Sequence, residues 1–185
     1  MADDNLSQLF VRLNTYKPNS VKYPDDYFAY LSCIEAFSAL RQGNYGVGGL
    51  LIDREKNIVV QGHNQMFYPF FRSDLHSEMV IMNAFEESNR HKLHTKNYTL
   101  YSSLEPCPMC TVRLIFAGIG RVLYVVEDQF GGLAHSLENL PLAWKQLANG
   151  KQFFGEACCS PELKSLALDI CMSNANALYT QLQQR

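Results

Sequence analysis

Two short motifs of this 185-residue chain combine residue types that bind metals and transfer protons. The first is His76-Ser77-Glu78, and the second is Pro106-Cys107-Pro108-Met109-Cys110. Cys107 and Cys110 are three positions apart, so their sulfurs face the same way on the first turn of a helix. The partial positive charge of a helix N-terminus favours thiolate over thiol. A cation can therefore sit between the two sulfurs.

Zinc is the cation that these side chains favour, because it prefers tetrahedral nitrogen and sulfur ligands. His76 is the natural third ligand. A site with three protein ligands leaves a fourth position open for water, and the metal lowers the pKa of that water toward about 7. Glu78 lies two residues after His76, where its carboxylate can accept and return a proton without binding the metal.

Other interpretations of the cysteines stay open. Cys-Pro-x-Cys also occurs in glutaredoxin-like redox pairs, but there the motif is expected after the first strand, and here it follows the third. A structural zinc site usually has four protein ligands, and Cys158 or Cys159 could supply the fourth. A non-catalytic zinc module that scaffolds partners is a further alternative, although such a site has no use for Glu78.

The elements that must position these motifs follow from the hydrophobic periodicity. Both motifs stand where a predicted strand passes into a predicted helix. Helical patterns cover residues 25–42, 74–88, 107–117, 140–148 and 161–182, and strand patterns cover 46–52, 58–60, 98–101 and 121–126. Asp25 or Asp26 is the expected N-cap of the first helix, and the first two strands read as a hairpin. Short strands that alternate with helices predict an α/β fold with a sheet covered on both faces.

Composition limits the function further. Hydrophobic residues make up 47% and charged residues 18%, and the net charge is −2. These values exclude a strongly basic nucleic-acid coat and an acidic disordered tail. Residues 1–5 lack the features of a secretory signal, and no apolar run approaches the roughly 18 residues of a membrane span. We expect a soluble cytoplasmic protein without a membrane partner.

The two motifs, with their spacing and their strand-to-helix context, resemble the signature of the zinc-dependent cytidine/deoxycytidylate deaminase superfamily. The segments Leu100–Cys110 and Gly62-His63-Asn64 look like its purine-acting branch, the guanine deaminases and tRNA adenosine deaminases. The resemblance covers residues from about 25 to about 128. It implies a three-layer α/β/α cytidine-deaminase-like fold with a mixed sheet of about five strands, and a homodimer. We expect one domain over residues 1–185, with its core at 25–128 and a C-terminal helical extension at 129–185.

The resemblance also implies roles for single residues. His76, Cys107 and Cys110 would bind Zn²⁺. Glu78 would move protons while the amino group of a base is replaced by an oxo group and ammonia is released. Asn64 matches the asparagine whose side-chain amide holds the edge of the base.

The substrate is the least determined part of this interpretation. Asp128 follows the last strand, where an acid could meet a purine amino group. The chain has Ser77 where alanine is common, and it lacks the Arg- and Lys-rich end helix that is typical of the tRNA enzymes. Binding of tRNA depends on phosphate contacts and clustered cations. We therefore expect a free purine such as guanine, or a nucleoside, with tRNA adenosine-to-inosine deamination as the alternative.

The remaining histidines, cysteines and aromatic residues have simpler interpretations. The aromatic run Met66–Phe71 either walls a base pocket by stacking or packs in the core or an interface, and the second is the default. Small core residues are expected at Cys33 and Cys171. A packing or hydrogen-bonding role is expected for His63, and surface positions are expected for His91, His94 and His135.

Overall fold

The computed structural model describes residues 2–90 and 94–184. In chain order its elements are α1 (Ala2–Thr15), α2 (Asp26–Arg41), β1 (Gly48–Ile52), β2 (Ile58–His63), α3 (Ser77–Ser88), β3 (Thr99–Leu104), α4 (Pro108–Ala117), β4 (Arg121–Val126), η1 (Leu137–Asn139), α5 (Leu142–Ala148), β5 (Phe153–Glu156) and α6 (Pro161–Gln183). In the described part of the chain, no helix has the length and apolar character needed to cross a membrane. The cytoplasmic location stays a prediction.

The five strands form one mixed sheet in the order β2-β1-β3-β4-β5. β1 is antiparallel to both of its neighbours, β2 and β3, whereas β3, β4 and β5 run parallel. The C-terminal ends of β2, β3 and β4 and the N-terminal end of β1 therefore meet at one edge of the sheet. The loops that leave this edge carry both sequence motifs.

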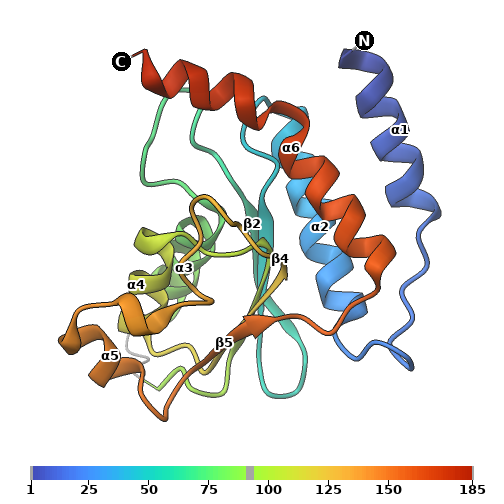
Figure 1. Ribbon diagram of the computed structural model, residues 1–185. Helices are drawn as coiled ribbons and strands as arrows, with labels where there is room; N and C mark the ends of the chain where they lie inside the picture. The colour runs from blue at the N-terminus through green and yellow to red at the C-terminus, as the bar shows by residue number, and fades with distance from the viewer. Residues whose placement is uncertain (1, 91–93, 185) are drawn as a thin grey trace.

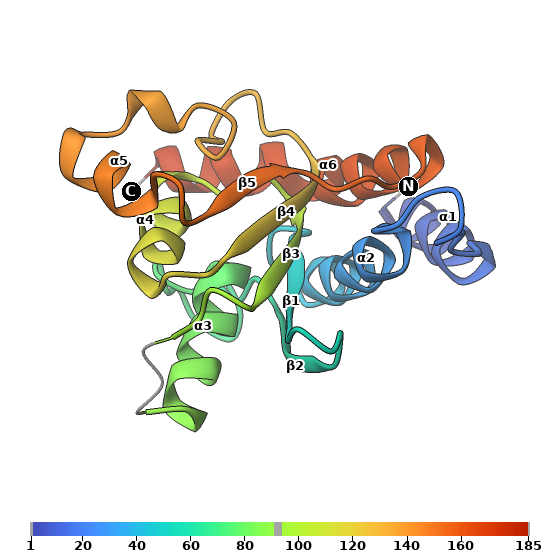
Figure 2. The same ribbon diagram turned by 90° about the horizontal axis from the view of Figure 1, so that it is seen from below.

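Helices cover both faces of the sheet, as Figure 2 shows with α2 on one side and α3 on the other. Neighbouring residues of a strand point to opposite faces, and the residues of β1 pack against helices on both faces of the sheet. Leu50 packs in a core with α1, α2 and α6, and Leu51 packs in a second core with α3 and α4. This double coverage explains why every residue of β1 is buried. The predicted three-layer α/β/α fold is confirmed.

Helix α1, strand β5 and the short 3-10 helix η1 were not foreseen in the sequence. α1 has a regular apolar spacing through Leu6, Leu9 and Leu13, and the last two are buried against α2 and α6. β5 lies within the segment expected to be a helical extension, and it adds the fifth strand to the sheet. Its sequence Phe-Phe-Gly-Glu is short, and pairing with β4 rather than local pattern determines its conformation.

The start of α2 differs from the expected helix cap. Asp25 occupies the N-cap position, but its carboxylate does not bind the first turn of its own helix. It accepts hydrogen bonds from the hydroxyl of Tyr101 (2.7 Å) and the backbone N–H of Cys158 (2.7 Å). Asp26 is fully buried and accepts from Tyr16 (2.6 Å) and the N–H of Ser160 (2.8 Å). The pair thus ties α2 to β3 and to the start of α6.

Candidate functional site

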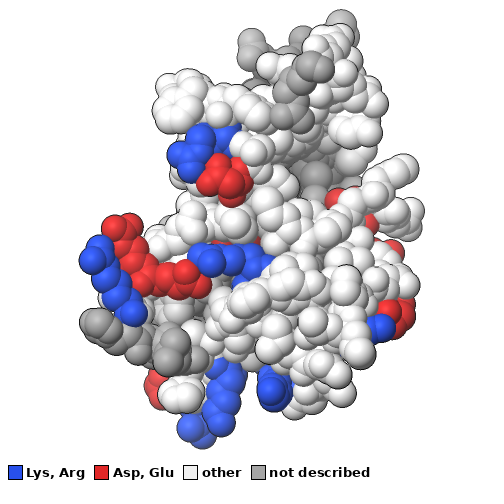
Figure 3. Space-filling model, turned by 90° about the vertical axis from the view of Figure 1, so that its left-hand side faces the viewer, with Lys and Arg blue, Asp and Glu red and all other residues white. Residues whose placement is uncertain are grey.

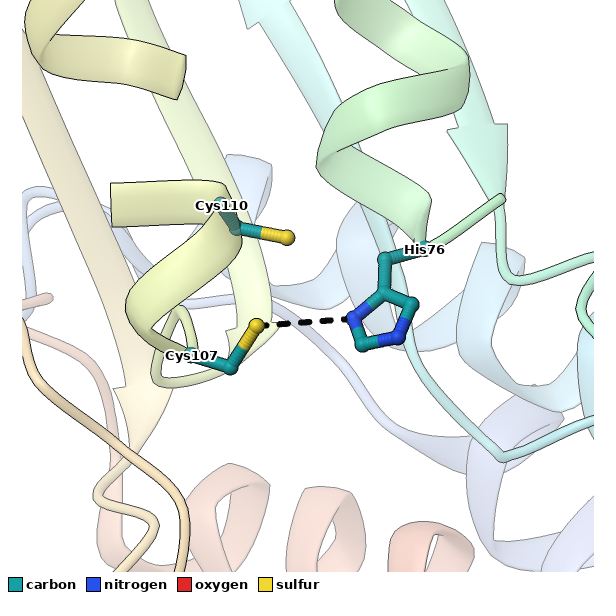
Figure 4. A group of neighbouring side chains, drawn as sticks. All are labelled: His76, Cys107 and Cys110. Atoms are coloured by element: carbon teal, nitrogen blue, oxygen red, sulfur yellow. Dashed lines mark hydrogen bonds between the residues drawn. The ribbon is translucent and has the colours of Figure 1, made fainter. Parts of the chain in front are cut away.

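The two motifs meet at the N-terminal ends of α3 and α4. His76 is the N-cap residue of α3, and Cys107 is the N-cap residue of α4; both have an extended backbone, and neither side chain caps its own helix. Pro108 is the first residue of α4, where a missing N–H costs little. The side chains of His76, Cys107 and Cys110 point toward one another (Figure 4).

The three side chains are close enough to share one ligand. The potential donor atoms of His76, Cys107 and Cys110 all lie within 4.8 Å of one another. The Nδ1 atom of His76 is 3.6 Å from the Sγ atom of Cys107. Cys110 is buried, and the other two are half-buried. The predicted ligand set is therefore assembled in space.

The pKa values of these groups reflect their contacts. Hydrogen bonds from the thiol of Cys110 and from His76 lower the pKa of Cys107 to about 4. The same hydrogen bond to Cys107, with burial, raises the pKa of Cys110 well above its usual range. The contact with Cys107 raises the pKa of His76. These contacts favour the thiolate form of Cys107, which is the form that binds a metal.

These three residues fit a zinc ion. Two sulfurs and one imidazole nitrogen are ligands that zinc prefers. A tetrahedral ion with Zn–S near 2.3 Å and Zn–N near 2.0 Å would separate a sulfur from a nitrogen by roughly 3.5 Å, and His76 and Cys107 are 3.6 Å apart. Cys158 and Cys159 do not belong to the group. Among the described residues, the site therefore offers three protein ligands rather than four.

Glu78 lies in the first turn of α3, two residues after His76. Its side chain is buried, with 3% exposed, and burial raises the pKa of its carboxyl group. Nearby Cys107 raises that pKa further. The hydroxyl of Ser77 donates a hydrogen bond to Oε2 of Glu78 (2.9 Å), which gives this serine a use in place of alanine. A carboxyl group with a raised pKa is suited to accept a proton and to return it.

Asn64 follows β2 at the same edge of the sheet. Its side chain is buried, and Oδ1 accepts the backbone N–H of Met66 (3.0 Å). Its Nδ2 group has no hydrogen-bond partner among the described residues, which leaves a donor for another molecule. This division of the amide suits the predicted contact with the edge of a base.

Asp128 has a local role that the sequence did not indicate. Its Oδ1 atom accepts the backbone N–H groups of Phe130 (3.1 Å) and Gly131 (3.0 Å). The carboxylate therefore stabilises the turn that follows β4. Contact with a substrate stays a prediction for this residue.

A second group of polar side chains was missed. Glu105 precedes Pro106, and its side chain is fully buried. It accepts the backbone N–H and the ring Nδ1–H of His135, both at 2.7 Å, and the N–H of Asp128 at 3.1 Å. The signal for this role was a charged residue between a buried strand and a proline. His135 is exposed as expected, but it is not free.

Other predicted positions have the expected surroundings. Cys33 and Cys171 are buried. His63 is hydrogen-bonded to Glu35 (2.7 Å), and His94 is exposed. His91 lies outside the described residues.

Comparisons with known proteins agree with this geometry. The family description "cytidine and deoxycytidylate deaminase zinc-binding region" matches residues 23–126, which is more than half of the chain. The tRNA-specific adenosine deaminase of Aquifex aeolicus is 30% identical over 118 residues, or 62% of this chain and 74% of that protein. The Bacillus subtilis enzyme of the same name is 31% identical over 107 residues, or 57% of this chain and 64% of that protein. A cytosine deaminase of Candida albicans is 31% identical over 99 residues, or 53% of this chain and 63% of that protein. The matched region thus spans less than two thirds of two of these three relatives.

Solved structures show the same fold. A structure from a study of tRNA:A34 deaminases has a TM-score of 0.64 and 22% identity, and the match covers 78% of this chain and 98% of that one. A guanine deaminase from Nitrosomonas europaea has a TM-score of 0.62 and 13% identity, with 86% and 90% covered. At these identities the likeness concerns the fold.

Proposed function

The chain belongs to the cytidine and deoxycytidylate deaminase family, and from this premise we propose that it is a zinc-dependent hydrolase of a nucleobase or nucleoside. The reaction replaces an exocyclic amino group with an oxo group and releases ammonia. The observation that carries this proposal is the convergence of His76, Cys107 and Cys110 within 4.8 Å beside the buried carboxyl group of Glu78.

The residues of the site divide the chemistry between them. His76, Cys107 and Cys110 would hold Zn²⁺, which supplies a Lewis acid that activates water near neutral pH. Glu78 accepts a proton from the attacking water and delivers it to the ring nitrogen of the base. It then takes the proton of the newly added hydroxyl group, as the oxo group forms, and delivers it to the leaving amine. Its raised pKa suits both accepting and returning that proton.

Asn64 orients the base. Its Oδ1 already accepts the N–H of Met66, so we assign the contact with the substrate to the Nδ2 donor. The edge of the base that faces Asn64 must therefore present an acceptor, such as a ring nitrogen or an exocyclic oxygen.

A free purine such as guanine, or its nucleoside, is our preferred substrate. Three arginines that could attract phosphate are paired with carboxylates: Arg72 with Asp74 (2.8 Å), Arg90 with Glu87 (3.6 Å) and Arg113 with Glu86 (2.6 Å). On the face shown in Figure 3, several basic side chains lie beside acidic ones. Such pairing weakens the attraction for a polyanion.

Deamination of tRNA adenosine is the second candidate. The names of the Aquifex aeolicus and Bacillus subtilis relatives favour it.

The homodimer also stays a prediction, which sedimentation of the purified protein tests.

The test is ammonia release by zinc-loaded protein from guanine, adenine, cytosine, their nucleosides and a tRNA anticodon stem-loop. We expect turnover of a free purine or its nucleoside. In Glu78→Gln we expect bound zinc to remain and kcat to fall by roughly 10²–10⁴-fold, whereas the exposed control Glu127→Gln should keep its activity.

Activity only on the stem-loop would favour the tRNA candidate. No turnover of any substrate, or full turnover by Glu78→Gln, would contradict the proposal.

A further inference from the structure

Three consecutive backbone amides between β2 and α3 are bound by two buried asparagine side chains. The N–H of Met66 donates to Oδ1 of Asn64 (3.0 Å). The next two N–H groups, those of Phe67 (2.7 Å) and Tyr68 (3.0 Å), both donate to Oδ1 of Asn44. Asn64 is the residue assigned to the base, so Asn44 holds the adjoining part of the same loop.

Asn44 is fully buried, a position where an apolar side chain would avoid the cost of burying an amide group. The Nδ2 atom has no hydrogen-bond partner among the described residues. A buried donor without a partner is unfavourable, and such cases in folded proteins need an explanation. Because Oδ1 accepts two backbone N–H groups, we attribute the role of this side chain to its oxygen.

Helix α6 holds Asn44 from the other side. The backbone oxygen of Asn44 accepts a hydrogen bond from Nδ2 of Asn174 (2.8 Å), 130 residues later in the chain. Figure 1 shows the loop after β2 rising to the C-terminal half of α6. The backbone N–H of Asn44 donates to the oxygen of Ala39 in α2 (3.0 Å), so the position of Asn44, and with it the loop, is set jointly by α2 and α6.

The loop closes immediately beside the site. The N–H of Gln65 donates to the oxygen of Leu75 (2.9 Å), the residue before His76, and the N–H of Arg72 donates to the oxygen of Met66 (2.7 Å). These two hydrogen bonds connect the start of the loop, after Asn64, with its end, before His76.

The side chains of this loop are aromatic and largely exposed. The ring of Phe67 packs edge-on against Tyr45 (5.6 Å between centroids) and Phe71 (5.7 Å). Tyr68, Phe70 and Phe71 are 58%, 63% and 42% exposed. Met66 is buried and Phe67 is half-buried, so core packing does not account for the exposed rings of Tyr68, Phe70 and Phe71. Exposed aromatic rings on a fixed backbone suit stacking against a planar base.

We propose that Asn44 is a positioning residue that fixes the aromatic loop Phe67–Phe71 as a stacking wall for the heteroaromatic ring of the substrate. This inference rests on the proposed deaminase function and adds a determinant of substrate binding. It places Asn44 outside the proton-transfer chemistry, so its loss affects binding of the base more than turnover.

The test compares three variants. Asn44→Ala removes the oxygen that accepts both N–H groups. Asn44→Asp keeps an oxygen for both, loses the unpartnered Nδ2 and adds a carboxylate charge that the two N–H donors stabilise. We expect KM for the base to rise roughly tenfold in Asn44→Ala with kcat changed less than about twofold, and KM to stay near the wild-type value in Asn44→Asp. Asn176→Ala, at an exposed position of α6, serves as the control without effect.

A readout independent of activity is hydrogen exchange of the Phe67 and Tyr68 amides. These amides should exchange faster in Asn44→Ala and keep their protection in Asn44→Asp. Asn174→Ala, which loses the bond to the Asn44 oxygen, should give an intermediate increase and serves if Asn44→Ala does not fold.

Unchanged exchange in both Asn44→Ala and Asn174→Ala would overturn the inference, as would a fall in kcat without a change in KM. If the wild-type protein deaminates nothing, the proposed function fails. The exchange measurement then still decides whether Asn44 holds the loop.

Discussion

The protein contains two clusters of residue types that can bind metals, one that includes Cys107 and one that includes Glu105. The polar atoms of the two clusters have different hydrogen-bond partners. In the first, the ligand atoms of His76, Cys107 and Cys110 face one another and cap no helix. In the second, Glu105, Glu127 and His135 also come within 4.8 Å of one another. There, however, the buried carboxylate of Glu105 accepts backbone N–H groups of the loop after β4.

The difference shows that residue type and proximity do not suffice to indicate a metal site. The lone pairs of Glu105 are already used by N–H donors, and Nδ1 of His135 is committed to Glu105. In the first cluster, Cys107 contacts both His76 and Cys110, and the side chain of Cys110 also contacts Glu78. We therefore propose metal binding for the first cluster, whereas the second cluster stabilises the loop after β4.

The largest expected effect follows from removing a ligand of the first cluster. Cys110→Ser should abolish zinc binding and nearly all turnover, and it should lower the free energy of unfolding, because metal binding contributes to folding. Zinc analysis and thermal unfolding measure this. The matched control is Cys171→Ser, at a buried cysteine outside the cluster, which should keep its zinc. A Cys110→Ser protein with full zinc occupancy would remove the basis of the comparison.

A smaller effect is expected at Asn64, whose Oδ1 accepts a backbone N–H and whose Nδ2 is the donor proposed to contact the base. Asn64→Asp keeps the acceptor for the N–H of Met66 but loses the Nδ2 donor. We expect kcat/KM to fall by roughly 10–100-fold with zinc content unchanged. Steady-state kinetics on the preferred base measure it, and an unchanged kcat/KM would show that Nδ2 does not contact the substrate.

The second cluster should respond in stability rather than in metal content. Glu105→Gln replaces one acceptor oxygen by an NH₂ group that faces a backbone N–H. We expect the free energy of unfolding to fall by about 1–3 kcal/mol and zinc to stay at one ion per chain. Glu127→Gln, at an exposed position, should change neither. A second metal equivalent that is lost in Glu127→Gln would show that this cluster also binds an ion.

The smallest expected effect is a pH dependence of the second cluster. The hydrogen bond to Glu105 raises the pKa of His135, with further contributions from Glu127 and Glu138. The bond therefore stabilises the fold fully below the ordinary histidine pKa of about 6.5, and this contribution is lost as pH rises through the raised pKa. Chemical unfolding of wild type and His135→Gln at several pH values should show a difference that shrinks with rising pH. A difference that grows with pH would contradict the charged pair.

Several parts of the fold and site could be predicted because local pattern determines them. The helices at His76 and Cys107 follow from capping position and apolar spacing, and they carry the proposed metal ligands with them. β5 depends on pairing with β4, and the N-cap of α2 depends on Tyr101 and Cys158. Such long-range partners leave no local signal.

The same distinction applies to the polar residues. A metal ligand is recognised by its type and spacing, whereas Glu105 and Asn44 are defined by the backbone N–H groups they accept. Those groups belong to loops 23 or more residues away. Their roles become visible only once the loops after β2 and β4 are placed.

X-ray absorption at the zinc edge of the purified protein tests the assignment of the first cluster most directly. We predict two sulfur ligands at about 2.3 Å and one histidine nitrogen at about 2.0–2.1 Å, with the sulfur signal lost in Cys107→Ser and Cys110→Ser. A spectrum with only oxygen and nitrogen ligands, or with four sulfurs, would contradict a site built from His76, Cys107 and Cys110.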